Sequence, residues 1–204
     1  METATIKKFE SREQILETLQ KDRELAGADM SGLDLSCIKL MAANLFGADL
    51  HNSNLANAKI VFTDMSNVNL ANANLEDAWI GGTSLRDANL RGAHMSAAKV
   101  TAVHMHDADL IGADLSDSRL IAVDVTGADF TDAKMENATA LVEWKDAKVQ
   151  PADLPEPIKP PHWLPFVFAA VVGLGVFLIL RRRNAAIATP TIRSKKQNKP
   201  FRTI

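Results

Sequence analysis

Every fifth residue from Leu25 to Met135 is apolar, without an insertion or a skip. The series holds 23 units, and the residue two positions before the apolar one is Ala in 13 of them. A period of five matches neither the helical period of about 3.6 nor the two-residue alternation of a strand. The spacing therefore predicts a solenoid in which each unit points one small and one large apolar residue inward.

The units share a motif, seen in ANLFGADL (43–50), ANANL (71–75), DANLRGAHM (87–95) and ADLIGADLSDSRL (108–120). This motif resembles the A(D/N)LXX pattern of the pentapeptide-repeat family. The resemblance implies an all-β solenoid, a right-handed quadrilateral β-helix with four units per coil and one unit on each face. At a strand spacing of about 4.8 Å, the 5.75 coils of 23 units would form a rod about 28 Å long.

The ends of such a rod need covers, because the end coils leave backbone groups and apolar side chains open. We expect a helical cap over residues 1–22, with an amphipathic helix in the stretch 11–25. Ser11 and Gln14 fit a capping box, and Ile15, Leu16 and Leu19 would cover the first coil. The β-helix itself is assigned to residues 23–140.

The segment after the repeats is rich in proline. The stretch QPADLPEPIKPPHWLP (150–165) carries six of the eight prolines, and we assign residues 141–162 to a stiff, extended linker. The stretch ATALVEWKDAKV (138–149) offers Trp144 and apolar residues that could close the last coil.

Residues 163–180 carry no charge and predict a single transmembrane helix. Eighteen helical residues span roughly 27 Å, close to the bilayer core, and Trp163 lies where an interfacial anchor would lie. Arg181, Arg182 and Arg183 follow at once and begin a basic tail over residues 181–204. The alternative, a buried globular helix, lacks a second domain to bury it. We expect the lipid bilayer to be a partner through residues 163–180.

The orientation of this span stays open. The larger number of cations after the span places the tail in the cytoplasm and the rod outside. The N-terminus, however, has no apolar signal-peptide core, which favours a cytoplasmic rod anchored by its tail. The order PEP, span, RRR also resembles a bacterial C-terminal sorting signal. We expect a single-pass protein of a bacterial inner membrane, with a slight preference for a cytoplasmic rod.

The chemistry-bearing residues do not form a catalytic or metal-binding group. Cys37 is the only cysteine, so no intrachain disulfide or thiolate cluster can form. On a four-unit coil, His94 and His104 fall on opposite faces, and no histidine pair converges with a carboxylate. The chain has no glycine-rich phosphate loop and no Ser-His-Asp grouping. We predict no enzyme, no metal and no cofactor.

Residues twenty apart stack on one face of a four-unit coil, and sorting by face separates the charges. The units centred on Leu40, Ile60, Ile80, Val100 and Leu120 form what we call the basic–apolar face. It contains no acid, although residues 23–137 hold 16 acidic residues. In 13 of the other 18 units the residue before the central one is Asn or Asp. The predicted interaction residues on the basic–apolar face are Lys39, Met41, Lys59, Phe62, Trp79, Lys99, Arg119 and Ile121.

This face has the composition of a contact surface, because aromatic residues and arginine are enriched at interfaces. The competing interpretation is chance drift along one side of a solenoid. We predict a non-catalytic, membrane-tethered scaffold or interaction rod that presents this face to a protein partner or to anionic lipid. Self-association is left open, and nucleic acid is not an expected partner.

A second hypothesis comes from the resemblance. Some pentapeptide-repeat proteins are similar to duplex DNA in shape and charge and protect DNA gyrase. The net charge of −8 over residues 23–137 suits such mimicry, whereas the span, the short rod and the basic face do not.

Overall fold

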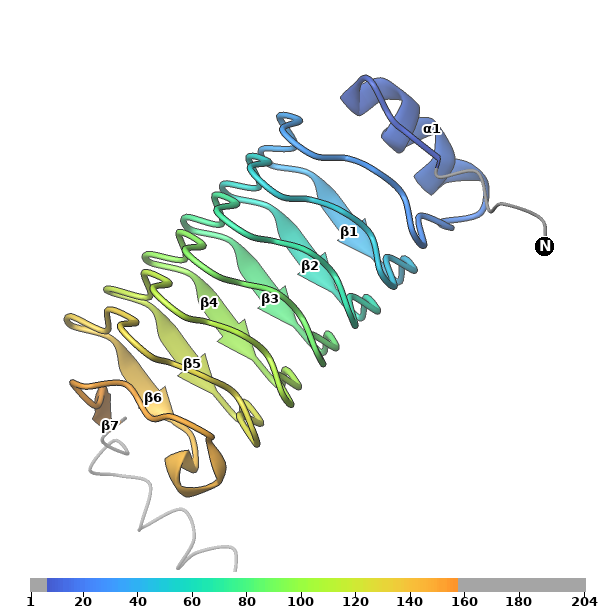
Figure 1. Ribbon diagram of the computed structural model, residues 1–204. Helices are drawn as coiled ribbons and strands as arrows, with labels where there is room; N and C mark the ends of the chain where they lie inside the picture. The colour runs from blue at the N-terminus through green and yellow to red at the C-terminus, as the bar shows by residue number, and fades with distance from the viewer. Residues whose placement is uncertain (1–6, 158–204) are drawn as a thin grey trace, which may run out of the picture. The chain divides into compact units, whose positions relative to one another are not determined.

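The computed structural model describes residues 7–157, which form a parallel β-solenoid preceded by one helix (Figure 1). The helix α1 covers Arg12–Lys21, and a single 3₁₀ turn covers Trp144–Asp146. The seven strands form one parallel sheet in chain order: β1 (Lys39–Met41), β2 (Lys59–Val61), β3 (Trp79–Gly81), β4 (Lys99–Thr101), β5 (Arg119–Ile121), β6 (Thr139–Leu141) and β7 (Glu156–Pro157).

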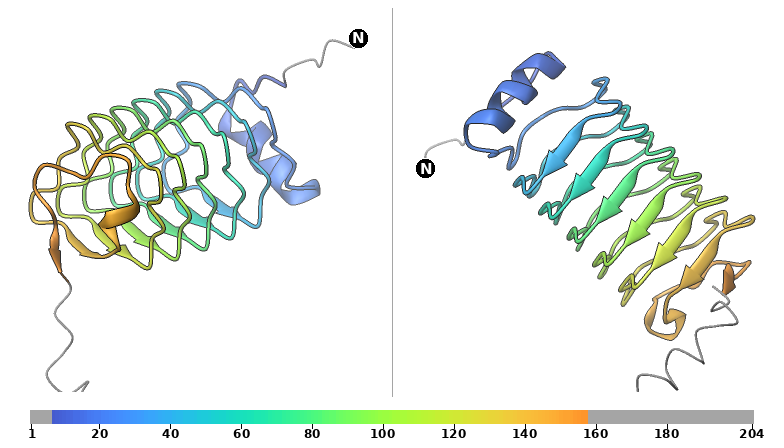
Figure 2. Two further views of the ribbon diagram at one scale, coloured as in Figure 1. Left: turned by 60° about the horizontal axis from the view of Figure 1, so that its bottom comes forward. Right: turned by 180° about the vertical axis from the view of Figure 1, so that it is seen from behind.

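The sheet register shows that one coil contains twenty residues. Lys39 pairs with Lys59, Lys59 with Trp79, and Trp79 with Lys99, each in parallel. Isolated parallel bridges with the same offset, such as Asp49 with Asn69, join the coils on the other sides. Four five-residue units therefore make one coil, as the family resemblance implies, and six successive coils each contribute one strand, β1 to β6 (Figure 2).

The core is the stack of inward side chains at two positions of every unit. Central residues such as Leu75 and Phe130 are fully buried, and so are the small residues two positions earlier, such as Ala73 and Ala128. Each large side chain stacks on its equivalent one coil away, so burial is continuous along the rod. The predicted inward positions are confirmed.

Three of the four sides of each coil turn in the same way. On these sides the amide of a small inward residue donates to the carbonyl of the central residue three positions earlier, as Ala48 does to Leu45 at 3.0 Å. The residue just before the donor, here Gly47, has a positive φ. Along the whole rod this φ lies between 50° and 72°, which suits Gly, Asn and Asp. An Asp or Asn before the central residue also accepts the amide two residues on, as Asp29 does from Ser31 at 3.1 Å.

The fourth side is built differently. Within residues 7–157, the units of the basic–apolar face make no such turn bond, and their central three residues form the strands β1 to β6. At this corner the Thr63 hydroxyl donates to the carbonyl of Leu40 at 3.0 Å. The residue before the central one is therefore a strand residue with an outward side chain, and Asn and Asp are disfavoured there.

The helix α1 closes the N-terminal end. Its N-cap is Ser11, whose hydroxyl accepts the Gln14 amide, while the Gln14 side chain accepts the amide of Glu10 rather than that of Ser11. Ile15 is completely buried and Leu19 packs partly on the core, as expected. Leu16 was expected to cover the first coil, but it is exposed, because it lies on the outer side of the helix.

The C-terminal end is closed by residues 141–157, which the proline content assigned to an extended linker. Trp144 packs edge-on against Phe130, with ring centroids 5.3 Å apart. The amide of Phe130 donates to the carbonyl of Val149, and β7 adds to β6 through the Glu156 amide. The prediction that residues 138–149 close the last coil is thus confirmed, whereas the described part of the predicted linker is folded rather than extended.

The predicted membrane segment 163–180, with Trp163, Arg181, Arg182 and Arg183, lies outside the described residues. Among residues 7–157, no helix has the length and apolar character needed to cross a bilayer.

Candidate interaction face

The eight predicted interaction residues all lie on the side of the rod that carries β1 to β5. Lys39, Lys59, Trp79, Lys99 and Arg119 are the first residues of these strands, and register places each beside the next. All five side chains are exposed. At a strand spacing of about 4.8 Å, this column is about 19 Å long. The residues that the twenty-residue offset assigned to one face therefore lie together in the structure. Their role in binding stays a prediction.

A second column runs along the third residues of the same strands. Met41 is 51% exposed and Ile121 is half-buried, and the positions between them hold Val61, Gly81 and Thr101. Two residues of a strand span about 6.6 Å, so the cationic and apolar columns run side by side. Sequence sorting stopped at residue 137 and missed Leu141, which is 60% exposed and continues the apolar column one coil further.

Phe62 has an unfavourable backbone conformation for an aromatic residue. Its φ is +55°, and among residues 7–157 no other aromatic residue has a positive φ. Asn, Asp, Gly or Ala hold most equivalent positions. The left-handed region costs an ordinary L-residue about 1 to 2 kcal/mol. The Phe62 side chain is nevertheless 73% exposed, so core packing does not account for it.

Two glycines lie beneath the aromatic side chains of this face. A Cβ on Gly82 would lie 2.6 Å from Phe62 Cδ1, so the phenyl ring rests directly over Gly82 of the next coil. A Cβ on Gly81 would lie 3.4 Å from Trp79 Nε1, so the indole leans over Gly81. The contact between Phe62 and Gly82 was not predicted from the sequence, although the twenty-residue offset between them was its signal.

The indole of Trp79 also meets a cation from the preceding coil. Lys59 Nζ lies 5.9 Å from the ring centroid, at the outer limit of a cation–π contact. Trp79 remains 46% exposed. Lys59, Trp79, Phe62, Gly81 and Gly82 thus form one cluster at the middle of the basic–apolar face, which we call the aromatic cluster.

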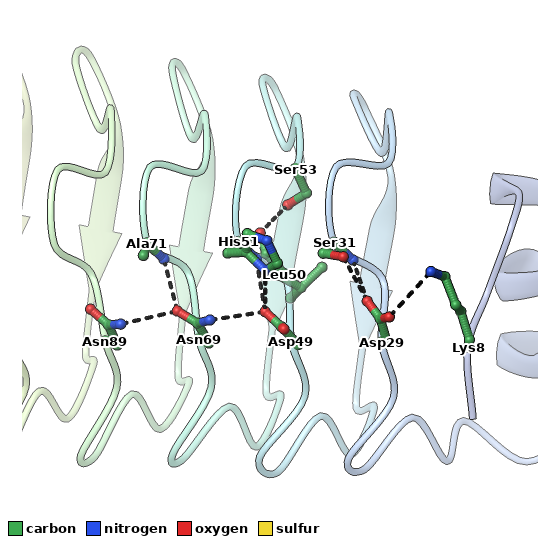
Figure 3. Close-up of polar contacts among 10 residues, drawn as sticks. All are labelled: Lys8, Asp29, Ser31, Asp49, Leu50, His51, Ser53, Asn69, Ala71 and Asn89. Carbon is green, nitrogen blue, oxygen red and sulfur yellow. Dashed lines mark hydrogen bonds and ion pairs between the residues drawn. The ribbon is translucent and has the colours of Figure 1, made fainter. Parts of the chain in front are cut away.

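The opposite side, which we call the Asp/Asn face, satisfies its own charges (Figure 3). Asn69 Nδ2 donates to Asp49 Oδ1 at 2.9 Å, and Asn89 Nδ2 donates to Asn69 Oδ1 at 3.0 Å. The remaining carboxylates of the column each have a cation nearby: Lys8 for Asp29 at 3.7 Å, Arg91 for Asp109 at 2.9 Å and Lys148 for Asp129 at 3.0 Å.

Hydrogen bonds in this column favour the ionised form of Asp29 and Asp129. Hydrogen bonds from the Thr131 side chain and from Lys148 lower the pKa of Asp129 from 3.8 to about 2. The hydroxyl and amide of Ser31 lower the pKa of Asp29. These acids accept hydrogen bonds within their turns. The aligned acids of the Asp/Asn face are therefore part of the hydrogen-bond network of the rod.

Histidines and carboxylates do not gather into a metal site within the described part of the chain. His51 Nδ1 lies 2.8 Å from Asp49, and His106 Nε2 lies 3.0 Å from Asp107. His51 and His106 thus each have a carboxylate of their own column or turn beside them, and Cys37 is exposed without a disulfide partner.

Comparison with known families identifies the repeat. A model of pentapeptide repeats matches eight copies, over residues 24–60, 34–70, 69–107 and 101–137. The chain belongs to the pentapeptide-repeat family. No curated protein matches it.

Solved structures of pentapeptide-repeat proteins are similar to this chain. One from the thylakoid lumen of Arabidopsis thaliana is 33% identical, over 52% of this chain and 71% of that chain, with a TM-score of 0.35. Rfr23 from the cyanobacterium Cyanothece 51142 is 21% identical, over 68% and 99%, with a TM-score of 0.34. QnrB1, a plasmid-mediated fluoroquinolone resistance protein, is 17% identical, over 62% and 77%, with a TM-score of 0.38. Because all three TM-scores are low, no functional conclusion follows from them.

Proposed function

We propose that this pentapeptide-repeat protein is a non-catalytic, membrane-tethered interaction rod that binds through its basic–apolar face. The observation that carries the proposal is the aromatic cluster. Phe62 occupies a conformation that costs stability, and its ring is mostly exposed. Non-glycine residues in the left-handed region often mark functional sites, and the contact of this ring with Gly82 leaves most of the side chain exposed. Protein partner and anionic lipid are the two classes of ligand that such a face suits.

Charge supports the same face. Its exposed lysines and arginine lie in one column without an acid among them, whereas the opposite column pairs its carboxylates internally. Complementary charge accelerates association and orients the partners, and desolvated aromatic side chains supply most of the contact energy. Lys39, Lys59, Lys99 and Arg119 would provide the attraction, and Met41, Phe62, Trp79 and Ile121 the apolar contact.

Tethering rests on residues 163–180, whose apolar run is followed by three arginines. In the proposed arrangement this segment crosses a bacterial inner membrane once, and the rod lies on the cytoplasmic side. Extraction with alkaline carbonate should leave the full chain in the membrane fraction, and deletion of residues 163–180 should release it. A full chain that is itself released would refute the tether. Protease access to an N-terminal tag in intact and in lysed cells determines the side.

The face is tested by combining Lys59→Glu, Lys99→Glu and Trp79→Ala in the full chain. Partners recovered from detergent extract, or binding to anionic vesicles, should be lost. The matched control is Arg86→Glu with Lys134→Glu, which reverses two charges on other faces and should leave binding intact. Equal recovery with both variants would contradict the proposal.

A DNA-mimic modulator of gyrase is the second candidate, and its support is the net charge of −8 over residues 23–137. Mimicry needs carboxylates that are free to bind a DNA-binding surface. Several carboxylates of the Asp/Asn face are instead bound by lysine, arginine or asparagine. Gyrase supercoiling assays with residues 1–158 test this candidate, and protection at stoichiometric amounts would establish it over the first.

A further inference from the structure

We propose that the ligand of the basic–apolar face is the anionic surface of the membrane that anchors the chain. This inference rests on the proposed tether and names the partner of the same face. The rod would lie on the bilayer with β1 to β6 facing the lipid headgroups.

The side chains of the face suit a fluid anionic surface better than a protein. Protein interfaces carry about one hydrogen bond per 100 to 200 Å². The outward strand positions of β1 to β6 provide uncharged hydroxyls only at Thr101 and Thr139. The other groups are apolar side chains and flexible cations. The cations can pair with lipid phosphates, which have no fixed arrangement. Lysine stems also pack along apolar surface while the ammonium reaches headgroups.

The aromatic cluster has the chemistry of an interfacial anchor. Tryptophan is enriched at the headgroup level of bilayers, where its ring is in apolar surroundings and its N–H remains in polar ones. Trp79 and Phe62 rest on glycines at the middle of the face, and both rings remain exposed. Met41 and Leu141 extend the apolar surface toward the two ends of the rod. The apolar contact therefore follows the sheet along its length.

The distribution of charge selects one orientation on an anionic surface. The five units of the basic–apolar face have no acid, and Glu156 of β7 is an acid at the C-terminal end of the same sheet; the other three sides carry the acids of the repeats. An anionic surface attracts the first and repels the others. Each lysine or arginine close to anionic lipid strengthens binding about fivefold.

The length of the chain brings this face close to the proposed anchor. The strand β7, which ends at Pro157, belongs to the same sheet as β1 to β6. Only residues 158–162 separate it from Trp163, and such a segment reaches roughly 20 Å at most. Anchoring at residue 163 therefore keeps the sheet within reach of the headgroups, and a weak attraction is enough because the effective concentration is high.

The test uses the full chain in nanodiscs that contain phosphatidylcholine and phosphatidylglycerol in equal parts, with a nitroxide-labelled lipid as quencher. In a Cys37→Ser background, a fluorophore is attached through Thr101→Cys on the basic–apolar face. Ala71→Cys on the Asp/Asn face is the matched control, because both positions follow a central residue and both are half-exposed. The Thr101→Cys label should be quenched and the Ala71→Cys label should not.

Adding Lys59→Gln and Lys99→Gln should lower the contact equilibrium about 25-fold, and discs of phosphatidylcholine alone should reduce quenching similarly. Equal quenching of both labels, or quenching that ignores lipid charge, would overturn the inference. An unquenched Thr101→Cys label on an anchored chain would also overturn it and leave the face to a protein partner. A chain that fails to co-purify with nanodiscs would instead refute the tether itself.

Discussion

Replacement of Phe62 by asparagine distinguishes a binding role from a structural one. The backbone at residue 62 has a φ of +55°, and asparagine holds the same conformation at residues 52, 57, 67 and 72. Phe62→Asn therefore removes the ring without requiring the backbone to move. Its effect on stability is the difference between two opposing terms.

The first term is the apolar contact that is lost. A phenylalanine side chain exposes roughly 200 Å² when free. Because Phe62 is 73% exposed, about a quarter of this area, roughly 50 Å², is covered in the rod. At about 25 cal/mol per Å², the lost contact destabilises the fold by about 1 kcal/mol. The second term is the relief of left-handed strain, which stabilises by about 1 kcal/mol or more. We expect a net change in the free energy of unfolding within about 1 kcal/mol of zero.

The assay is urea unfolding of residues 1–158, whose core is closed at both ends by α1 and by Trp144, followed by circular dichroism. Phe130→Ala supplies the scale, because this buried ring should cost about 3 to 5 kcal/mol. Binding to anionic vesicles by the same two proteins should show the reverse order, with Phe62→Asn impaired and Phe130→Ala intact while folded. A loss of more than about 2 kcal/mol in Phe62→Asn would refute the reasoning, because the ring would then be a structural support.

Three further predictions concern the interior and the Asp/Asn face. The Ser118 hydroxyl is buried without a hydrogen-bond partner, so Ser118→Ala should stabilise the rod by about 1 kcal/mol in urea unfolding, whereas Ser53→Ala, which removes a bond to the Leu50 carbonyl, should not. Asn69→Asp replaces an amide donor by a second carboxylate next to Asp49 and should destabilise by about 1 to 3 kcal/mol at pH 7, less at high salt; Asn54→Ser, without added charge, is the salt-insensitive control. The pKa of Asp129 falls from 3.8 unfolded to about 2 folded, so its contribution of about 2 kcal/mol is complete above about pH 5 and is lost as pH falls toward 2. Asp129→Asn should flatten the stability profile across that window, and an unchanged profile would refute the assignment.

The inward positions could be predicted from the spacing, because a five-residue period with a small residue two positions before each large apolar one defines them. The four-unit coil followed from the family resemblance, and the twenty-residue offset then assigns every outward residue to a side. The register of Lys39, Lys59 and Trp79 confirms both steps. The helix over Arg12–Lys21 was equally accessible, because its cap and its buried Ile15 are local features.

The difference between strand and turn sides could not be predicted from the spacing, because both sides use the same five-residue unit. The absence of Asn and Asp from the basic–apolar face was therefore interpreted as functional. The structure gives it a local cause, since a strand residue such as Lys99 has no turn amide within reach of a short acceptor side chain. This cause explains the missing Asn and Asp, but it does not dictate lysine, arginine or tryptophan in their place.

Side-chain contacts between coils were the other feature that the sequence did not predict. The Phe62 ring over Gly82 and Trp144 against Phe130 join residues that are twenty and fourteen positions apart. The first followed the known offset and was missed because sorting considered one column at a time. The second lies beyond the repeat, where the offset of twenty no longer holds; the sequence predicted that residues 138–149 close the last coil, but not that Trp144 packs on Phe130.

The two opposite sides of the rod treat like charges in different ways, and this difference supports a ligand for one of them. Neighbouring unit charges about 5 Å apart repel by about 1 kcal/mol in water, less in salt. On the Asp/Asn face, asparagines lie between carboxylates, and Arg91 and Lys148 neutralise others. The basic–apolar face offers its cations no carboxylate or amide of its own. Thr139 occupies the same column one coil after Arg119, so a neutral strand residue could also have separated these cations. Cations that the fold leaves uncompensated remain available, and an anionic ligand is what would relieve their repulsion.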